Sequence, residues 1–272
     1  MPELPEVETT RRGIAPHVTG SRVTRVVIRE PRLRWRVDDD LPALTAGQRI
    51  DSVDRRAKYL LIGLSSGHHL LLHLGMSGSL RLVTPDSPVK THDHVAVELD
   101  NGQTLRFNDP RRFGSLHITA GDPEAHSLLA GLGPEPLESA FDGDYLYRVG
   151  RKRRAAVKGF IMDSRVVVGV GNIYAAEALH RAGIHPGRPA RRISRVRYRR
   201  LADTVKAVLA EAIDVGGTTL RDFTASDGQP GYFRQSLAVY GRGTGDCPHC
   251  GRQLHTRVIA QRTTVFCPRC QT

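Results

Sequence analysis

The sequence lacks the features that mark a membrane or secreted protein. No stretch approaches the ~18 consecutive apolar residues that a membrane-spanning helix requires. No charged and then apolar leader precedes the first expected strand, and there is neither an internal repeat nor a low-complexity tail. We therefore expect a cytoplasmic globular protein whose 272 residues form about two domains.

Acidic residues are scarce relative to basic ones. The chain has 28 Asp and Glu residues against 40 Lys and Arg residues, a formal net charge of +12. Such an excess predicts a polyanionic partner, with nucleic acid as the first candidate. The arginines are spread through segments that we expect to fold, so they do not form a basic tail. Charge alone identifies no activity.

Cysteine occurs only four times, in two Cys-x-x-Cys pairs separated by sixteen residues. This spacing is typical of a zinc ribbon, and four thiolates suit a closed tetrahedral structural site. Disulfides are the alternative, which the absence of a secretory leader disfavours. We therefore predict one structural Zn²⁺ per chain, bound by Cys247, Cys250, Cys267 and Cys270. Arg262 falls on the expected hairpin between the pairs, where it can present a guanidinium to a backbone phosphate.

The N-terminal segment, residues 1–8, can supply an unusual nucleophile. Removal of Met1 would leave Pro2 with a free secondary amine, which can attack an aldehyde-like carbon to form an iminium ion. An α-amino group titrates near ~7.7–8.0, so a useful fraction is unprotonated at neutral pH. Glu3 and Glu6 supply carboxylates that could transfer protons at the same carbon. Because Met-Pro starts are common, this motif alone does not establish catalysis.

Hydrophobic patterning predicts a β-rich first half. A short helix over 6–14 should end near Gly13 and Pro16. Apolar runs and alternating patterns predict strands at 22–29, 48–53, 59–64, 69–74, 95–99 and 104–107. These strands indicate a sandwich or barrel. The turn-forming residues 131–136 are the best candidate for a linker between domains.

Helical periodicity dominates after the linker. Ser194 can cap a helix whose apolar residues share one face, and Gly216-Gly217 should end it. The apolar residues are Leu201, Val205, Val208, Leu209, Ala212 and Ile213. Arg195, Arg199 and Lys206 lie on the opposite face, which is most simply a solvated surface but could also follow phosphates.

Two further motifs suggest sites without establishing them. Residues 166–174 read as strand, Gly-x-Gly turn and helix, but the third glycine of a dinucleotide fingerprint is missing. A phosphate of nucleic acid at the start of this helix is the better interpretation, with Asn172 as an added donor. His92-Asp93-His94 could offer two imidazoles on one side of a strand, but no third metal ligand is near, so we interpret it as hydrogen-bonding structure.

Taken together, these features resemble the formamidopyrimidine-DNA glycosylase family, bacterial base-excision enzymes for oxidised purines. The matching segments are 2–8, 56–60, 73–78, 109–114, 169–175, 227–233 and the zinc ribbon. The resemblance implies an α+β fold with three parts: an N-terminal β-sandwich catalytic domain (1–131), a helical domain with a helix-two-turns-helix motif (135–235) and a zinc finger (238–272). DNA would lie in the cleft between domains.

The resemblance also assigns roles to individual residues. It makes Pro2 the nucleophile and Glu3 the proton donor, and it places Lys58 beside the damaged nucleotide and adds Arg262 to the catalytic set. Met76, Arg111 and Phe113 match residues that fill the space left by an extruded base, and Lys158, Asn172 and Arg262 match residues that grip phosphates. His92 and Arg112 complete the expected DNA-binding set.

The implied activity is a bifunctional glycosylase and AP lyase that removes 8-oxoguanine and formamidopyrimidines from duplex DNA, followed by β,δ-elimination. We expect a monomer that acts in the bacterial cytoplasm on the nucleoid and does not associate with membranes. The endonuclease VIII branch, which favours oxidised pyrimidines, fits less well, because the Leu4 opening and the 227–233 loop resemble the purine branch. A non-catalytic zinc-ribbon nucleic-acid binder would explain the charge and the cysteines but not the N-terminal motif.

Overall fold

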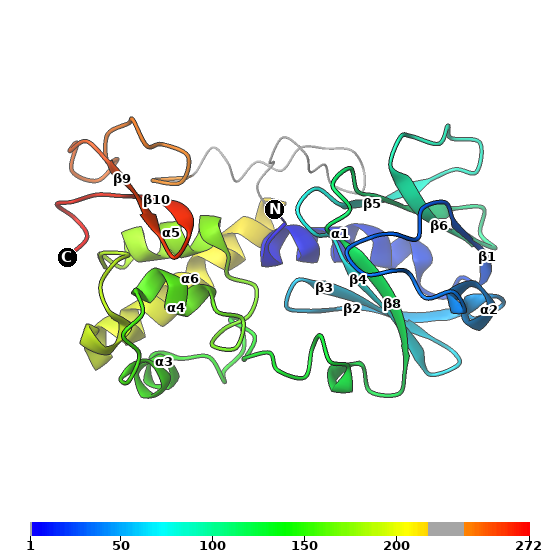
Figure 1. Cartoon of the computed structure of the whole chain (residues 1–272), viewed down its shortest axis with the longest axis horizontal. Coiled ribbons are helices and arrows are strands. Elements are labelled where there is room, and N and C mark those ends of the chain that lie inside the picture. Colours follow the sequence, from blue (N-terminus) through cyan, green and yellow to red (C-terminus); the bar gives the residue numbers. More distant parts are fainter. Residues whose placement is uncertain (1, 217–236) are drawn as a thin grey trace. The chain divides into compact units, whose positions relative to one another are not determined.

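The computed structural model describes residues 2–216 and 237–272, and these divide into two compact units. The first unit contains residues 2–130 and Gly216, and the second contains residues 131–215 and 237–272. Figure 1 shows the elements of both units. No helix within the described residues combines the length and apolar character needed to cross a membrane.

The first unit opens with a helix that is longer than the sequence predicted. Helix α1 spans Leu4–Val18, whereas the prediction ended it near Gly13 and Pro16, both of which lie inside it. An interior proline costs about 3 kcal/mol or more because it lacks the N–H group and crowds the preceding turn. Ile14 and Val18 are fully buried in the core, and burial contributes about 1.5–3 kcal/mol for each such side chain. Packing on both sides of Pro16 therefore offsets its cost.

Two four-stranded antiparallel sheets form the body of the first unit (Figure 1). In spatial order, one sheet contains β1 (Val23–Ile28), β6 (Asp93–Leu99), β7 (Thr104–Asn108) and β5 (Ser79–Val83). The other contains β2 (Ile50–Arg56), β3 (Tyr59–Leu64), β4 (His68–His73) and β8 (Ser115–Ala120). The six predicted strands are present with shifts of a few residues at their ends, and β5 and β8 are two strands that the prediction missed. A short helix, α2 (Leu41–Thr45), and a 3₁₀ turn, η1 (Pro123–Ala125), complete this unit.

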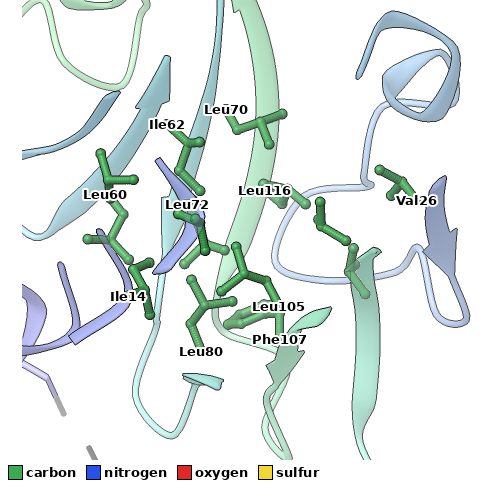
Figure 2. Packing of buried hydrophobic residues seen from close by; sticks show 14 of the residues in the cluster. Ile14, Val26, Leu60, Ile62, Leu70, Leu72, Leu80, Leu105, Phe107 and Leu116 are labelled. Carbon is green, nitrogen blue, oxygen red and sulfur yellow. The ribbon is translucent and has the colours of Figure 1, made fainter. Parts of the chain in front are cut away.

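Alternating apolar side chains from both sheets fill one hydrophobic core. Figure 2 shows Leu60, Ile62, Leu70 and Leu72 of β3 and β4 pointing into the same cluster as Leu105. In β5 and β8, polar residues alternate with apolar residues that lie in or against this core, as expected for sheets with one buried face; the apolar residues are Leu80, Leu82, Leu116 and Ile118. The core and the two sheets confirm the predicted β-sandwich.

The second unit is helical and ends in a small hairpin. Its helices are α3 (Gly143–Gly150), α4 (Val157–Met162), α5 (Asn172–Arg181) and α6 (Arg195–Asp214), with a 3₁₀ turn, η2 (Ala190–Arg192). Helices α5 and α6 are joined by the turns of residues 182–194, which gives the helix-two-turns-helix arrangement. The hairpin consists of β9 (His255–Ile259) and β10 (Arg262–Phe266).

Helix α6 agrees with its sequence pattern. Ser194 caps it by accepting a hydrogen bond from the Arg197 N–H, and the six predicted apolar residues are buried. On the opposite face, the Arg195 and Arg199 guanidiniums both pair with the Asp144 carboxylate, at 2.6 and 2.9 Å. These ion pairs favour the simpler interpretation of that face as solvated surface.

The strand expected just before α5 is absent. Val166, Val167 and Val168 are buried in turns rather than in a sheet, and the Val166 and Val167 N–H groups bond to the Asp163 carbonyl. Their apolar run reflects burial, because a short apolar run cannot by itself distinguish a strand from another buried segment. The strand-turn-helix pattern of a dinucleotide fold is therefore not formed here.

Candidate active site and nucleic-acid interface

The start of α1 places Pro2 and Glu3 in a buried, fixed position. Glu3 is the N-cap residue of α1, and the Glu6 carboxylate accepts a hydrogen bond from the Glu3 backbone N–H at 2.8 Å. Pro2, Glu3 and Glu6 are all buried. The sequence offered two carboxylates for proton transfer, those of Glu3 and Glu6. The hydrogen bond shows that the Glu6 carboxylate stabilises the turn beside Pro2.

Lys58 lies in the tight turn between β2 and β3, after Ala57 in a left-handed conformation (φ 55°). The side chain is partly buried. Burial, reinforced by the positive charges of Lys58 and Arg34, lowers the pKa of His73 to about 4. His73 is thus neutral at physiological pH, and its Nδ1 accepts a hydrogen bond from the Gly75 N–H at 3.0 Å.

Two loops of the first unit carry the side chains expected to enter DNA. Met76 lies in the loop between β4 and β5, and Arg111 and Phe113 lie in the loop between β7 and β8. Met76 is 37% exposed and Phe113 44% exposed, so both large apolar side chains are open to solvent. The Arg111 guanidinium lies 4.9 Å from the centre of the Phe113 ring, within cation–π range.

His92 and Arg112 both adopt left-handed backbone conformations, with φ angles of 73° and 53°. Both side chains are exposed, and Arg112 pairs with Glu30 at 3.4 Å. His94 is buried, and its Nε2 lies 2.8 Å from the Asp109 carbonyl. His94 thus forms hydrogen-bonding structure, and the described residues hold no three-residue metal group that includes either histidine.

Lys158 is fully buried on α4, although the sequence predicts that it grips a phosphate. Its Nζ donates to the Asn172 Oδ1 at 2.5 Å and to the Thr264 Oγ1 at 2.6 Å. The Asn172 amide in turn donates to the Thr263 carbonyl at 3.3 Å. Lys158 and Asn172 therefore join α4, α5 and β10, and a direct phosphate contact by Lys158 stays a prediction.

Arg262 is exposed at the start of β10, next to the turn of Ala260 and Gln261. Both turn residues have positive φ, as a tight two-residue hairpin requires. Within residues 2–216 and 237–272, no hydrogen bond or ion pair engages the Arg262 guanidinium. The hairpin thus presents a cation to solvent, which suits a phosphate contact.

The four cysteines converge as the spacing predicts. Their sulfur atoms all lie within 4.8 Å of one another, with Cys247 Sγ 3.9 Å from Cys270 Sγ and Cys250 Sγ 3.6 Å from Cys267 Sγ. A tetrahedral zinc with bonds of about 2.3 Å separates its sulfurs by about 3.8 Å, so these distances fit the ion. They exclude disulfides, whose S–S bond is about 2.05 Å. The centre is one structural zinc site, formed by the zinc ribbon of residues 247–272.

Two residues of α5 support this ribbon and the segment that leads into it, and the sequence analysis missed both. The buried Glu177 carboxylate accepts three backbone N–H groups, from Ala238, Val239 and Tyr240, at 2.8 to 3.0 Å. One turn further along α5, His180 Nε2 lies 3.4 Å from Cys247 Sγ. Both partners are more than 60 residues away in the sequence, so no local pattern predicts these contacts.

A basic run at residues 151–154 was also missed. Arg151, Lys152, Arg153 and Arg154 follow α3 and are all exposed. In the described part of the chain, none of these side chains pairs with a carboxylate, whereas Arg165, Arg181 and Arg195 all do. Four consecutive cations were the available signal for this exposed basic surface.

The fold and the site together define a multidomain DNA-binding enzyme with a structural zinc ribbon. Residues 1–116 match the formamidopyrimidine-DNA glycosylase N-terminal domain, residues 132–224 the H2TH domain of the same enzymes, and residues 247–272 the zinc finger found in FPG and IleRS. The chain belongs to the formamidopyrimidine-DNA glycosylase family. It is therefore a base-excision DNA glycosylase for damaged bases, in a family with AP lyase activity.

Relatives match the chain over its whole length. The formamidopyrimidine-DNA glycosylase of Alkalilimnicola ehrlichii is 62% identical over 277 residues and covers 100% of both chains. The MutM (Fpg) protein from Thermus thermophilus is 45% identical, with a TM-score of 0.90 over 99% of this chain and 98% of that one. The Lactococcus lactis protein bound to DNA containing Fapy-dG is 31% identical, with a TM-score of 0.91 over 99% and 100% of the two chains. The segment 227–233 that resembled the purine branch lies outside the described residues.

Proposed function

We propose that this enzyme removes oxidised purines, 8-oxoguanine and formamidopyrimidines, from duplex DNA through a covalent intermediate on Pro2. The observation that carries the proposal is the start of α1, where Pro2 directly precedes the buried N-cap residue Glu3. A DNA complex of a full-length relative contains Fapy-dG, which supports this substrate class. Removal of Met1 is required, because the Pro2 nitrogen is otherwise an amide.

The chemistry follows from the amine. The Pro2 nitrogen bonds to C1′ as the bond from C1′ to the ring oxygen breaks, and the base then leaves with the proton that this nitrogen gives up, which forms the iminium. Glu3 donates the proton that the sugar ring oxygen takes up as the ring opens. The resulting iminium makes the C2′ proton acidic, so its loss expels the 3′ phosphate, and a further elimination expels the 5′ phosphate. Glycosylase and lyase steps thus share one nucleophile.

The remaining residues bind and position the DNA. A base must leave the stack before C1′ can be attacked, which costs a few kcal/mol, and inserted side chains offset part of this loss. Met76, Arg111 and Phe113 take that role, with Lys58 beside the damaged nucleotide. Arg262 and Asn172 hold backbone phosphates, supported by Lys158, and His92, Arg112 and the basic run at 151–154 add further contacts.

We also place the enzyme in the bacterial cytoplasm, acting as a monomer on the nucleoid. The net charge of +12 supports binding to DNA, and repulsion between like-charged copies favours a monomer.

Borohydride trapping tests the nucleophile. Borohydride should reduce the iminium and lock the processed enzyme onto DNA containing 8-oxoguanine. Pro2→Gly should trap poorly, whereas Pro5→Ala, in the same helical turn but without an amine, should trap like the wild type. Undiminished trapping by Pro2→Gly would assign the nucleophile to another amine such as Lys58. Glu3→Gln should stop base release while leaving DNA affinity nearly intact.

A further inference from the structure

The Asp109 carboxylate lies between the two loops that carry Met76 and the Arg111–Phe113 pair. Its Oδ1 accepts a hydrogen bond from the Ser77 hydroxyl at 2.7 Å, in the first loop. Its Oδ2 accepts one from the Gly114 N–H at 2.7 Å, in the second loop. Asp109 is fully buried, so both bonds are shielded from water. One carboxylate therefore connects the two loops.

Additional bonds extend this connection to Arg111. The Arg111 N–H lies 3.3 Å from both the Asp109 Oδ1 and the Ser77 Oγ. The Asp109 carbonyl accepts hydrogen bonds from His94 and from the Arg112 N–H, which ties the same residue to β6. The backbone carbonyl of Asp109 thus bonds to the sandwich, while its carboxylate bonds to both loops.

The loops also touch each other directly through glycines. A Cβ atom at Gly75 would lie 2.4 Å from the Gly114 nitrogen and 2.5 Å from the Phe113 carbonyl carbon. Gly75 has a φ of 69°, which side chains other than glycine rarely adopt. The backbone just before Met76 is therefore packed against the backbone of Phe113 and Gly114. The separation of the two loops is set by these contacts rather than by regular secondary structure.

We propose that Asp109 is a positioning residue that makes Met76, Arg111 and Phe113 enter the DNA stack as one rigid unit. The proposal rests on the proposed function, which gives these three side chains their place in DNA. The physical reason is preorganisation: side chains on irregular loops insert productively only if buried contacts fix their spacing, and a misplacement of about 1 Å can cost about a hundredfold in rate.

Coupling between the two loops provides the test. The probe is duplex DNA with 2-aminopurine beside 8-oxoguanine, whose fluorescence rises when the neighbouring base unstacks. We measure the rate of that rise in Met76→Ala, Phe113→Ala and the double variant, and repeat the cycle in an Asp109→Asn background. In the wild-type background the two effects should be strongly non-additive, because the side chains act together.

Asp109→Asn is informative because asparagine has nearly the same shape but only one carbonyl oxygen. If that oxygen accepts the Gly114 N–H, the amide group faces Ser77 and the Arg111 N–H, and the Arg111 N–H keeps only the Ser77 hydroxyl oxygen as an acceptor. We expect unstacking to slow by about tenfold or more and the Met76 and Phe113 effects to become additive. Ser77→Ala, which removes only the hydroxyl, should show the same loss of coupling if Asp109→Asn does not fold.

Asp38→Ala is the matched control. The Asp38 carboxylate also accepts a backbone N–H group in the first unit, that of Ile118 at 2.9 Å. Its ion-pair partner among the described residues is His117, which lies on β8 and in neither loop. The control should lose some thermal stability and keep the coupling. Coupling that persists in both Asp109→Asn and Ser77→Ala, or effects that are already additive in the wild type, would overturn the positioning role.

The outcome also separates this inference from the proposed function. If neither Met76→Ala nor Phe113→Ala changes the fluorescence rise, the proposed place of these side chains in DNA is wrong and the inference fails with it. If both slow the rise but the Asp109 background leaves their coupling intact, only the role of Asp109 is wrong.

Discussion

The Lys158 ammonium lies 2.6 Å from the Thr264 hydroxyl, so a fully buried cation joins α4 to the hairpin of the zinc ribbon. The same ammonium donates to the Asn172 side chain at the start of α5. A buried charge is tolerated when polar groups surround it. Removal of the charged group leaves those polar groups unpaired. The proposed phosphate contacts of Asn172 and Arg262 thus depend on an interior network.

We predict that Lys158→Met lowers the free energy of unfolding by about 1–3 kcal/mol, because the acceptors on Asn172 and Thr264 lose a buried donor. Thermal unfolding of the zinc-loaded protein measures the change. Lys152→Ala removes an exposed cation and should leave the unfolding temperature nearly unchanged. If Lys158→Met is as stable as the wild type, the buried network does not hold the ribbon.

Arg262→Ala should weaken DNA binding without destabilising the protein. Each lost phosphate contact lowers the slope of log affinity against log salt by about one. Titrations of duplex DNA at several salt concentrations measure this slope. An unchanged slope would remove Arg262 from the DNA interface, and a lower unfolding temperature would show instead that the hairpin itself is disturbed.

His180→Phe should release zinc faster than the wild type. The substitution removes the hydrogen bond to Cys247 Sγ, and loss of a group that supports a metal ligand typically costs about 10–100-fold in metal affinity. A chromophoric chelator follows the release directly, without any assay of enzyme activity. His255→Phe, which alters a histidine on the hairpin that packs near Phe266, should release zinc at the wild-type rate. Equal release rates in the two variants would exclude His180 from the support of the site.

Stability should fall as the pH drops from about 6.5 towards 4. The pKa of His73 is lowered to about 4 by burial, with the positive charges of Lys58 and Arg34 adding to the effect. Between that value and the ordinary pKa of about 6.5, the unfolded chain binds a proton that the folded chain does not, so acid favours unfolding. The full contribution, roughly 3 kcal/mol, is present above pH 6.5 and is lost progressively down to about pH 4.

Denaturant titrations across this pH range measure the effect, and His73→Gln should flatten it. A profile that keeps its full slope in this variant would assign the acid sensitivity to another group.

Local patterns in the sequence predicted much of the fold. Alternating apolar residues located six strands of the sandwich, and the cysteine spacing located the metal site. The strand β8 was missed although Leu116 and Ile118 alternate with polar residues, because the strand directly follows the irregular loop of Arg111 and Phe113. Gly13 and Pro16 gave a false helix end, since packing of the surrounding helix overrode a local preference.

The supporting contacts of the site could not be predicted in the same way. Asp109 meets Ser77, which is 32 residues earlier, and Lys158 meets Thr264, which is 106 residues later. Such contacts depend on which surfaces the folded chain brings together, and no periodicity encodes them. Residues with reactive or exposed groups, such as Pro2 and Arg262, can be picked out by their chemistry. The buried polar residues that hold them cannot.

The three hydrogen bonds to Glu177 have a consequence for how the second unit opens. Ala238, Val239 and Tyr240 belong to no helix or strand, yet their N–H groups are held by one buried carboxylate on α5. Their amide hydrogens can exchange with solvent only when the hydrogen bonds to this carboxylate break. This irregular segment should therefore be as protected from exchange as the helix that carries the carboxylate. Residues 238–240 and α5 should therefore open as one cooperative segment rather than fray separately.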